Sequence, residues 1–210
     1  MREDTKTLLF AATVCVSCSL LLSGTAAGLK TRQESNKAFD VKRNIVKAFG
    51  IDIGDMKRPE IETTFEKHVS EEAAGELPLY TWTDEGGDTP SKYAFPISGK
   101  GLWSTLYGYL SLNGDLETIA GISFYKHGET PGLGAEIEKD WFQSQFAGKR
   151  LYQHGDAVDF EVVKPGSPSA DTSVDGISGA TLTGKGVQAL ICKDAARYAD
   201  YFNQLKENHE

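Results

Sequence analysis

A run of 23 residues without a single charged side chain, Thr7–Leu29, constrains this chain more than any other feature. As an α-helix at about 1.5 Å per residue it would reach about 35 Å, enough to cross a hydrocarbon layer about 30 Å thick. We therefore expect one membrane-spanning helix. The competing interpretation is a cleaved secretory signal, with Arg2 and Lys6 as its charged start and residues 25–27 as its small-residue exit. Both interpretations take the rest of the chain to a compartment reached through a membrane.

The net charge and the cysteine and histidine positions indicate which classes of binding partner to expect. The chain has 210 residues and a net charge of −8, and its short Lys/Arg clusters build no basic patch, so we expect no nucleic-acid partner. Cys15 and Cys18 lie inside the apolar run, either as small membrane-helix residues or as a contact to a partner's metal centre. Cys192 falls on an apolar helical face and is predicted to be core. We predict no metal site, because the four histidines show no ligand spacing: His68, His127, His154 and His209.

Beyond the apolar run, helical and strand patterns follow one another. Apolar residues at helical spacing predict helices at 32–49, from Pro59 to a terminator at Gly75, at 137–146 and at 186–205. β-Branched and aromatic runs predict strands at 77–82, 93–97, 118–125 and 159–163. The predicted fold class is α+β, with a transmembrane anchor at 1–30 followed by a single domain at 31–210.

Two glycine-rich segments lie beside predicted helices. One is Glu129-Thr-Pro-Gly-Leu-Gly, and the other is Asp175-Gly-Ile-Ser-Gly-Ala-Thr-Leu-Thr-Gly-Lys-Gly, which leads into the last helix. Glycines before a helix let the backbone approach an anion, and the unpaired N–H groups of the first turn donate to it. Neither segment matches a P-loop, a dinucleotide-binding loop or a serine-hydrolase elbow. The residues alone leave two interpretations, an anion site or a glycine turn with a Ser/Thr N-cap.

The second segment resembles a known acceptor sequence. Its D-G-I-S-G-A-T is similar to the D-G-x-[ST]-G-A-[TS] of FMN-binding domains that are modified by FAD:protein FMN transferases. That resemblance implies one FMN per chain, attached covalently to Thr181 as a phosphoester. The E-T-P-G-L-G segment is shared by the same family. The segment Gly99-Lys-Gly-Leu-Trp-Ser-Thr-Leu-Tyr-Gly, together with residues 29–51, resembles the C subunits of Na+-translocating NADH:quinone reductases (the NqrC family) more than the G subunits of Rnf complexes.

The resemblance also implies a function and a location. A member of this family would be an electron-carrying flavoprotein, without catalytic residues of its own, that passes electrons from an iron–sulfur centre to a second flavin during quinone reduction coupled to sodium export. Its partners would be the B, D and E subunits together with the A and F subunits, and an FMN transferase for maturation. Its domain would lie on the periplasmic side of a bacterial inner membrane. Simple charge counting disagrees, because basic residues follow the apolar run, although long domains translocate with little regard to such charges.

The same resemblance, combined with the residue types, gives a set of candidate cofactor-binding residues. The expected phosphate neighbours lie near the start of the last helix: Ser178, Gly179, Ala180, Thr183 and Lys185. The flavin ring is expected between the segments 99–103 and 129–134, beside Trp103, Glu129, Thr130, Gly132 and Leu133. Two of these keep an alternative interpretation, since Trp103 could be ordinary core and Glu129 could cap a turn.

Three alternatives belong to other functional classes. The G subunit of an Rnf-type ferredoxin:NAD oxidoreductase would carry the same flavin and serve another redox partner. A non-redox membrane-tethered binding module would use the glycine segment as a structural turn and would be colourless. A secreted flavoprotein would lack the N-terminal segment after processing.

Overall fold

The computed structural model describes residues 3–167 and 170–207 and has an α+β fold, as predicted. The chain divides into two compact units, one up to Phe39 and one from Asp40 onward. Arg2 and His209, which entered the sequence predictions, lie outside the described residues. The domain boundary expected near residue 30 stays a prediction.

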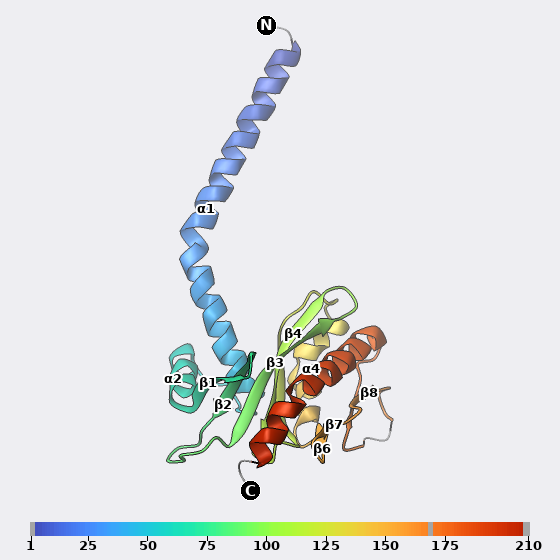
Figure 1. Cartoon of the computed structure of the whole chain (residues 1–210). Helices are drawn as coiled ribbons and strands as arrows, with labels where there is room; N and C mark the ends of the chain where they lie inside the picture. The colour runs from blue at the N-terminus through green and yellow to red at the C-terminus, as the bar shows by residue number, and fades with distance from the viewer. Residues whose placement is uncertain (1–2, 168–169, 208–210) are drawn as a thin grey trace. The chain divides into compact units, whose positions relative to one another are not determined.

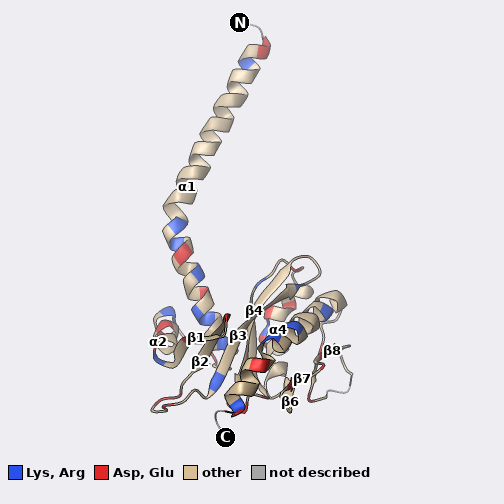
Figure 2. Cartoon of the chain, viewed as in Figure 1, with Lys and Arg blue, Asp and Glu red and all other residues tan. Residues whose placement is uncertain are grey.

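The first unit consists of the exposed part of helix α1 (Glu3–Ala48), which contains no proline. The stretch of α1 between Lys6 and Lys30 carries no charged side chain, visible as an uninterrupted tan ribbon in Figure 2. Its large apolar side chains are exposed, among them Leu8, Phe10 and Leu21. The helix is long and apolar enough to cross a membrane. Cys15 and Cys18 lie on its exposed surface.

The second unit is built on a five-stranded antiparallel sheet in which strands adjacent in sequence pair with each other. Its strands are β1 (Val69–Ala74), β2 (Leu77–Trp82), β3 (Lys92–Lys100), β4 (Thr105–Asn113) and β5 (Ile119–Lys126). Pro96 fits inside β3 because β2 pairs only with residues 92–94 of that strand, so the missing N–H breaks no ladder bond.

Helix α4 (Thr181–Glu207) packs against β3 and closes the hydrophobic core (Figure 1). Tyr93, Phe95 and Ile97 alternate along β3, so all three point to the face of the sheet that α4 covers. Phe95 stacks on Tyr198 of α4, with ring centroids 4.4 Å apart. Cys192 is partly buried and packs at the edge of this core.

The opposite face of the sheet holds the last turns of α1. Side chains of the sheet donate hydrogen bonds to the carbonyl groups that end this helix: Ser123 to Asn44, Ser111 to Ala48, and Lys92 to Phe49. The Ala48 carbonyl, at the end of the helix, has no partner within the helix, so the Ser111 hydroxyl satisfies it. The membrane-type helix is thereby built into the fold of the domain at its C-terminal end.

The remaining elements are short. Helix α2 (Arg58–His68) precedes β1, and three pieces follow β5: η1 (Gly134–Glu138), α3 (Asp140–Gln143) and η2 (Ser144–Phe146). A small hairpin and a parallel pair complete the described chain: β6 (Tyr152–Gln153) with β7 (Asp156–Ala157), and β8 (Glu161–Val163) with β9 (Ser173–Asp175).

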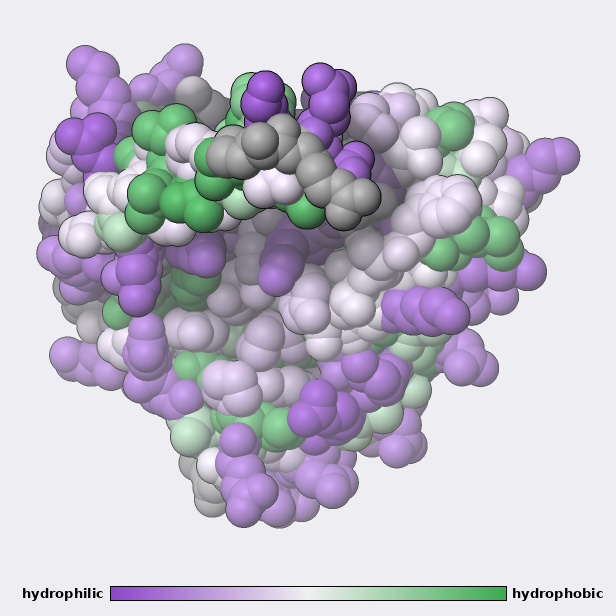
Figure 3. Space-filling view, turned by 90° about the horizontal axis from the view of Figure 1, so that it is seen from above, coloured by the Kyte–Doolittle hydropathy of each residue, from purple (hydrophilic) through white to green (hydrophobic). Residues whose placement is uncertain are grey.

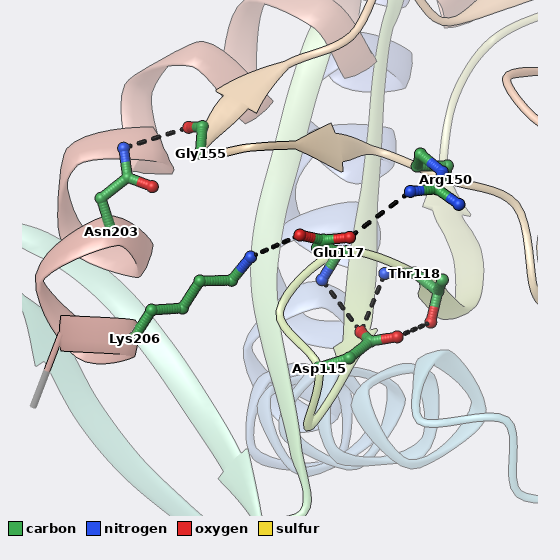
Figure 4. A network of polar contacts seen from close by, with 7 residues as sticks. All are labelled: Asp115, Glu117, Thr118, Arg150, Gly155, Asn203 and Lys206. Atoms are coloured by element: carbon green, nitrogen blue, oxygen red, sulfur yellow. Dashed lines mark hydrogen bonds and ion pairs between the residues drawn. The ribbon is translucent and has the colours of Figure 1, made fainter. Parts of the chain in front are cut away.

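A polar network ties the last turns of α4 to the β4–β5 connection (Figure 4). Asp115 accepts the N–H groups of Glu117 and Thr118, both at 2.9 Å, and the Thr118 hydroxyl at 2.6 Å. Glu117 in turn accepts from Lys206 at 2.8 Å and from Arg150 at 3.5 Å. These contacts hold the far end of α4 on the sheet, so the helix is fixed at both ends.

The structure confirms the strands predicted at 77–82, 93–97 and 118–125 and the helix at 32–49. The helix predicted from Pro59 to Gly75 ends at His68, because β-branched Val69 pairs with Trp82 and Gly75 makes the hairpin turn. The helix predicted at 137–146 is broken into three short pieces. The last helix begins five residues before Gly186, and β4 was not predicted at all.

Gly121 provides a test of how α1 joins the sheet. A Cβ at this position would lie 2.6 Å from the Ala48 carbonyl oxygen, so Gly121→Ala is expected to lower the free energy of unfolding by about 2 kcal/mol through overpacking. The control is Gly87→Ala, whose Cβ would keep an ordinary 3.4 Å contact. Urea unfolding of the detergent-solubilised chain measures both. Equal stability of the two variants would contradict this packing of α1 on β5.

Candidate functional site

Three segments that are far apart in the sequence meet at the carboxylate of Glu129. This side chain is only 5% exposed. It accepts the N–H of Trp103 at 2.9 Å and those of Leu102 and Ser104 at 3.3 Å each. It also accepts the hydroxyl of Thr183, in the first turn of α4, at 2.7 Å. One carboxylate therefore joins the turn after β3, the segment after β5 and the start of α4.

Glycines make this close packing possible. A Cβ on Gly101 would lie 2.7 Å from Oε1 of Glu129, and one on Gly134 would lie 2.6 Å from Oγ1 of Thr183. At Gly186, a Cβ would lie 2.5 Å from the carbonyl oxygen of Lys100. Each distance is shorter than any ordinary carbon–oxygen contact. Gly101 and Gly134 therefore leave room for the side chains of Glu129 and Thr183, and Gly186 lets the start of α4 approach the backbone of Lys100.

Hydrogen bonding decides the charge state of Glu129. Burial by itself raises the pKa of this carboxyl group, but the Thr183 hydroxyl and the N–H groups of residues 102–104 outweigh burial and hold the pKa below its ordinary value. Glu129 is therefore ionised at neutral pH. Its N–H donates to Nδ1 of His127 at 3.1 Å, which leaves the proton of a neutral His127 ring on Nε2.

Thr181 is the first residue of α4, and its side chain is exposed. Within the described part of the chain, its hydroxyl has no hydrogen-bond partner. The first N–H of α4 bonded within the helix is that of Gly184, which donates to the Ala180 carbonyl at 3.0 Å. Among the residues that the structure describes, the N–H groups of residues 181–183 have no hydrogen-bond partner, so they can face an anion. Lys185 is exposed and follows Thr181 by four residues, so it lies on the same side of the helix.

The predicted site residues fall into two groups. Exposed ones surround the start of α4 and the two turns: Ser178, Gly179, Thr181, Lys185, Trp103, Thr130, Gly132 and Leu133. Ala180, Glu129 and Thr183 are buried. Trp103 is 71% exposed, so the interpretation as core is wrong. Glu129 does cap a turn, because its carboxylate accepts three successive N–H groups.

Exposed apolar side chains accompany the free hydroxyl. Leu102, Trp103, Leu133 and Leu182 are between 42% and 71% exposed, and together we call them the apolar rim. Leu133 approaches the second glycine segment, since a Cβ on Gly179 would lie 3.0 Å from its Cδ2. In the face visible in Figure 3, apolar side chains form small separate groups among hydrophilic ones. Leu102 and Leu182 were not predicted from the sequence, although each adjoins a residue that was.

In the part of the chain that the structure describes, potential metal ligands are not gathered into one site. Among residues 3–167 and 170–207, no three side chains of His, Cys, Asp or Glu are placed to hold a metal ion. The arrangement offers instead a reactive hydroxyl, unpaired amides, a nearby ammonium group and an exposed apolar surface. These features suit an anion with a flat apolar group attached to it.

Known proteins are similar to this chain in both sequence and fold. Residues 101–195, which contain all three segments of the site, match the family model "FMN-binding domain". The C subunit of the Na(+)-translocating NADH-quinone reductase of Pseudomonas aeruginosa is 33% identical, over 90% of this chain and 90% of its own length. The chain belongs to this C-subunit family. The corresponding protein of Vibrio vulnificus is 31% identical, over 87% of both chains.

Solved structures of the same family agree with this assignment. The crystal structure of the C subunit from Parabacteroides distasonis is 32% identical, has a TM-score of 0.73, and covers 83% of this chain and 96% of its own. The structure of NqrC from Shewanella oneidensis has the same TM-score at 26% identity and covers 82% of this chain and 99% of its own. The resemblance seen in residues 99–108 and 129–134 is thus confirmed at the level of the family.

The ionised state of Glu129 predicts how stability changes with pH. A carboxyl group with a lowered pKa stabilises the fold above its unfolded pKa, near 4.5, and loses that contribution as the pH falls through its folded pKa. Glu129→Gln is therefore expected to unfold more easily than the wild type at pH 7. The difference should shrink steadily below about pH 4.5. Thermal unfolding from pH 7 to pH 3 measures this difference in stability. A difference independent of pH would refute the ionised state of Glu129.

Proposed function

We propose that this chain is the electron-carrying flavoprotein subunit of a Na+-translocating NADH:quinone oxidoreductase, with one FMN bound covalently to Thr181. Membership in the C-subunit family supports the complex. One observation carries the attachment site: Thr181 presents an exposed, unpaired hydroxyl at the N-terminal turn of α4, inside the D-G-I-S-G-A-T sequence. The hydroxyl of Thr183, two residues later, is fully buried and donates to Glu129.

The proposed attachment uses FAD as co-reactant, brought by an FAD:protein FMN transferase. The Thr181 oxygen forms a bond to the phosphorus of the FMN half, the pyrophosphate bond breaks, and AMP leaves. The proton of the hydroxyl passes to a base of the transferase or to water. The difference between the two threonines explains the choice of acceptor, because Thr183 would have to give up its bond to Glu129 and leave the core to react.

The residues around Thr181 fit the phosphate that such a bond would hold. The free N–H groups of residues 181–183 and the positive end of the helix dipole favour a negative charge at this position. Lys185, one turn further along the same side, adds a positive charge. Ser178 and Gly179 are exposed just before the helix, and the positive φ of Gly179, 77°, turns the chain into α4.

The apolar rim fits the ring system of the cofactor. A flat ring held at Thr181 could cover Leu133, Leu182 and the indole of Trp103, which are otherwise open to water. The turn at Thr130 and Gly132 presents Leu133, since the N–H of Leu133 donates to the Thr130 carbonyl at 3.1 Å. FMN would supply the redox chemistry, and this chain would supply attachment, orientation and partial shielding from water.

Electron carriage implies partners on both sides. We propose that the electrons come from an iron–sulfur centre in neighbouring membrane subunits and leave to a second flavin on the B subunit, in a complex that also contains the A, D, E and F subunits. The exposed apolar side chains of α1 suit packing against such membrane proteins or lipid. We place the domain on the periplasmic side of the inner membrane. A role for Cys15 or Cys18 beside a partner's metal centre stays a prediction.

The attachment is tested with the full chain, co-expressed with an FMN transferase. Thr181→Ala is expected to abolish fluorescence of the protein band on a denaturing gel and the mass gain of one FMN phosphoryl group. Thr181→Ser keeps a hydroxyl and serves as the matched control, with retained modification. A Thr181→Ala chain that still carries FMN after denaturation would exclude Thr181 as the acceptor. A colourless wild-type chain would favour the non-redox tether.

The membrane anchor makes a separate prediction. If α1 stays in the membrane, intact mass of the mature protein includes residues 7–29, and alkaline carbonate leaves it in the membrane fraction. A mature chain that begins after residue 27 and appears in the soluble fraction would instead show a cleaved signal. That result would support the alternative of a secreted flavoprotein. It would contradict the proposal that the chain is a subunit of a membrane complex.

A further inference from the structure

The carboxylate of Glu129 is saturated with contacts from the chain itself. Oε1 accepts the N–H groups of Trp103 and Ser104, and Oε2 accepts the N–H of Leu102 and the hydroxyl of Thr183. With four donors and 5% exposure, the group offers no free face to an external ligand. Its influence on any bound molecule must therefore pass through the residues that it holds.

Those residues lie in the two segments that present Trp103 and Thr181, two of the exposed groups of the site. The turn at 102–104 presents Trp103 to solvent, while its N–H groups point inward to Glu129. The first turn of α4 presents Thr181, and its inward-facing Thr183 reaches the same carboxylate. The link is short and stiff, because an ionised acceptor forms stronger hydrogen bonds than a neutral one and glycines 101 and 134 pack directly against it.

We propose that Glu129 is a positioning residue, which sets the spacing between Trp103 and Thr181 and thereby how the indole packs against FMN, without contacting FMN. The part of this inference that concerns FMN rests on the proposed function. The four hydrogen bonds of the Glu129 carboxylate, which we call the clamp, involve only residues of this chain. The two parts can therefore be tested separately.

Glutamine is the decisive substitution because it has nearly the same shape. A carboxylate accepts hydrogen bonds at both oxygens, whereas an amide has one accepting oxygen and one donating NH2 group. In Glu129→Gln the NH2 group must face donors, either the N–H groups of Trp103 and Ser104 at the Oε1 position or the N–H of Leu102 and the Thr183 hydroxyl at the Oε2 position. The matched control is Glu136→Gln, which removes a carboxylate from the same segment that bonds only to the Trp141 ring, at 3.2 Å.

The first measurement is amide hydrogen exchange on the full-length, FMN-free chain in detergent. Glu129→Gln is expected to speed exchange of the amides at 102–104 by about tenfold, with β5 and the middle of α4 unchanged. Glu136→Gln should leave the 102–104 amides at the wild-type rate. Unchanged exchange at 102–104 in Glu129→Gln would overturn the clamp, whatever the state of flavin attachment.

The second measurement uses the flavinylated chain. Tryptophan quenches flavin emission on contact, so a displaced Trp103 is expected to make the FMN of Glu129→Gln brighter than that of the wild type. In a Trp103→Leu background the same substitution should add nothing, because the quencher is already gone. A purely structural role for Glu129 would leave the emission unchanged in the folded chain. Faster exchange with unchanged emission would therefore overturn the positioning of FMN while keeping the clamp.

Thr183 supplies a second pair of variants in case Glu129→Gln does not fold. Thr183→Val keeps the shape and loses the hydroxyl, whereas Thr183→Ser keeps the hydroxyl. Brighter FMN in Thr183→Val, restored to the wild-type level in Thr183→Ser, would support the inference. Equal emission in the two variants would overturn it. Failure of the wild-type chain to take up FMN would refute the proposed function alone, because the exchange measurement needs no flavin.

Discussion

The packing of this domain around its site depends on one buried carboxylate that is kept ionised by four hydrogen bonds. Glu129 lies where β5 has ended, and it gathers donors from a turn and from a helix that lie before and after it in the sequence. A buried anion without such donors would be strongly destabilising, so the surrounding chain must keep its shape for the fold to persist. The buried Glu129 carboxylate thus fixes the segments that carry the exposed groups of the site.

The second organising contact is the seating of α1 on the sheet. The backbone N–H groups of Phe49 and Gly50 cap the carbonyls of Ile45 and Lys47. The sheet adds the Ser111 hydroxyl on the Ala48 carbonyl and the Lys92 ammonium on the Phe49 carbonyl. One face of the sheet is therefore committed to α1, and the other to α4 and the hydrophobic core. The domain uses both faces of a single sheet, and the site forms at the end where β3 turns into β4.

Local patterns were sufficient to predict much of the fold. Strands with dense β-branched or aromatic residues, such as Leu77–Trp82, and the amphipathic last helix could be read from their periodicity. Strand β4 was missed because Gly108 interrupts the apolar positions of its core face, which are otherwise Leu106, Leu110 and Leu112. The early end of α2 was missed because pairing with β2, a contact across the hairpin, decides the conformation of Val69. Such contacts leave no local signal.

The residues of the candidate site can be selected from the sequence, and that selection stays a prediction, whereas their internal order cannot be read from the sequence. The glycine segments and Thr181 could be selected from the sequence, since a motif and a resemblance both point to them. The inward direction of Glu129 and Thr183 could not, because a carboxylate or hydroxyl in a glycine-rich turn can face either solvent or protein. Only the three-dimensional arrangement distinguishes the threonine that is held in the core from the one that is exposed.

The close backbone approach at glycines 101, 134 and 186 also restricts how such a sequence can drift. Any side chain at these positions meets a carboxylate, a hydroxyl or a carbonyl within 2.7 Å, so compensation would need changes in two segments at once. The exposed loop around Gly86 and Gly87 has no comparable constraint from packing. Substitutions should therefore accumulate more readily at Gly87, whose added Cβ would make an ordinary 3.4 Å contact, whereas the three glycines can be replaced only by coordinated change.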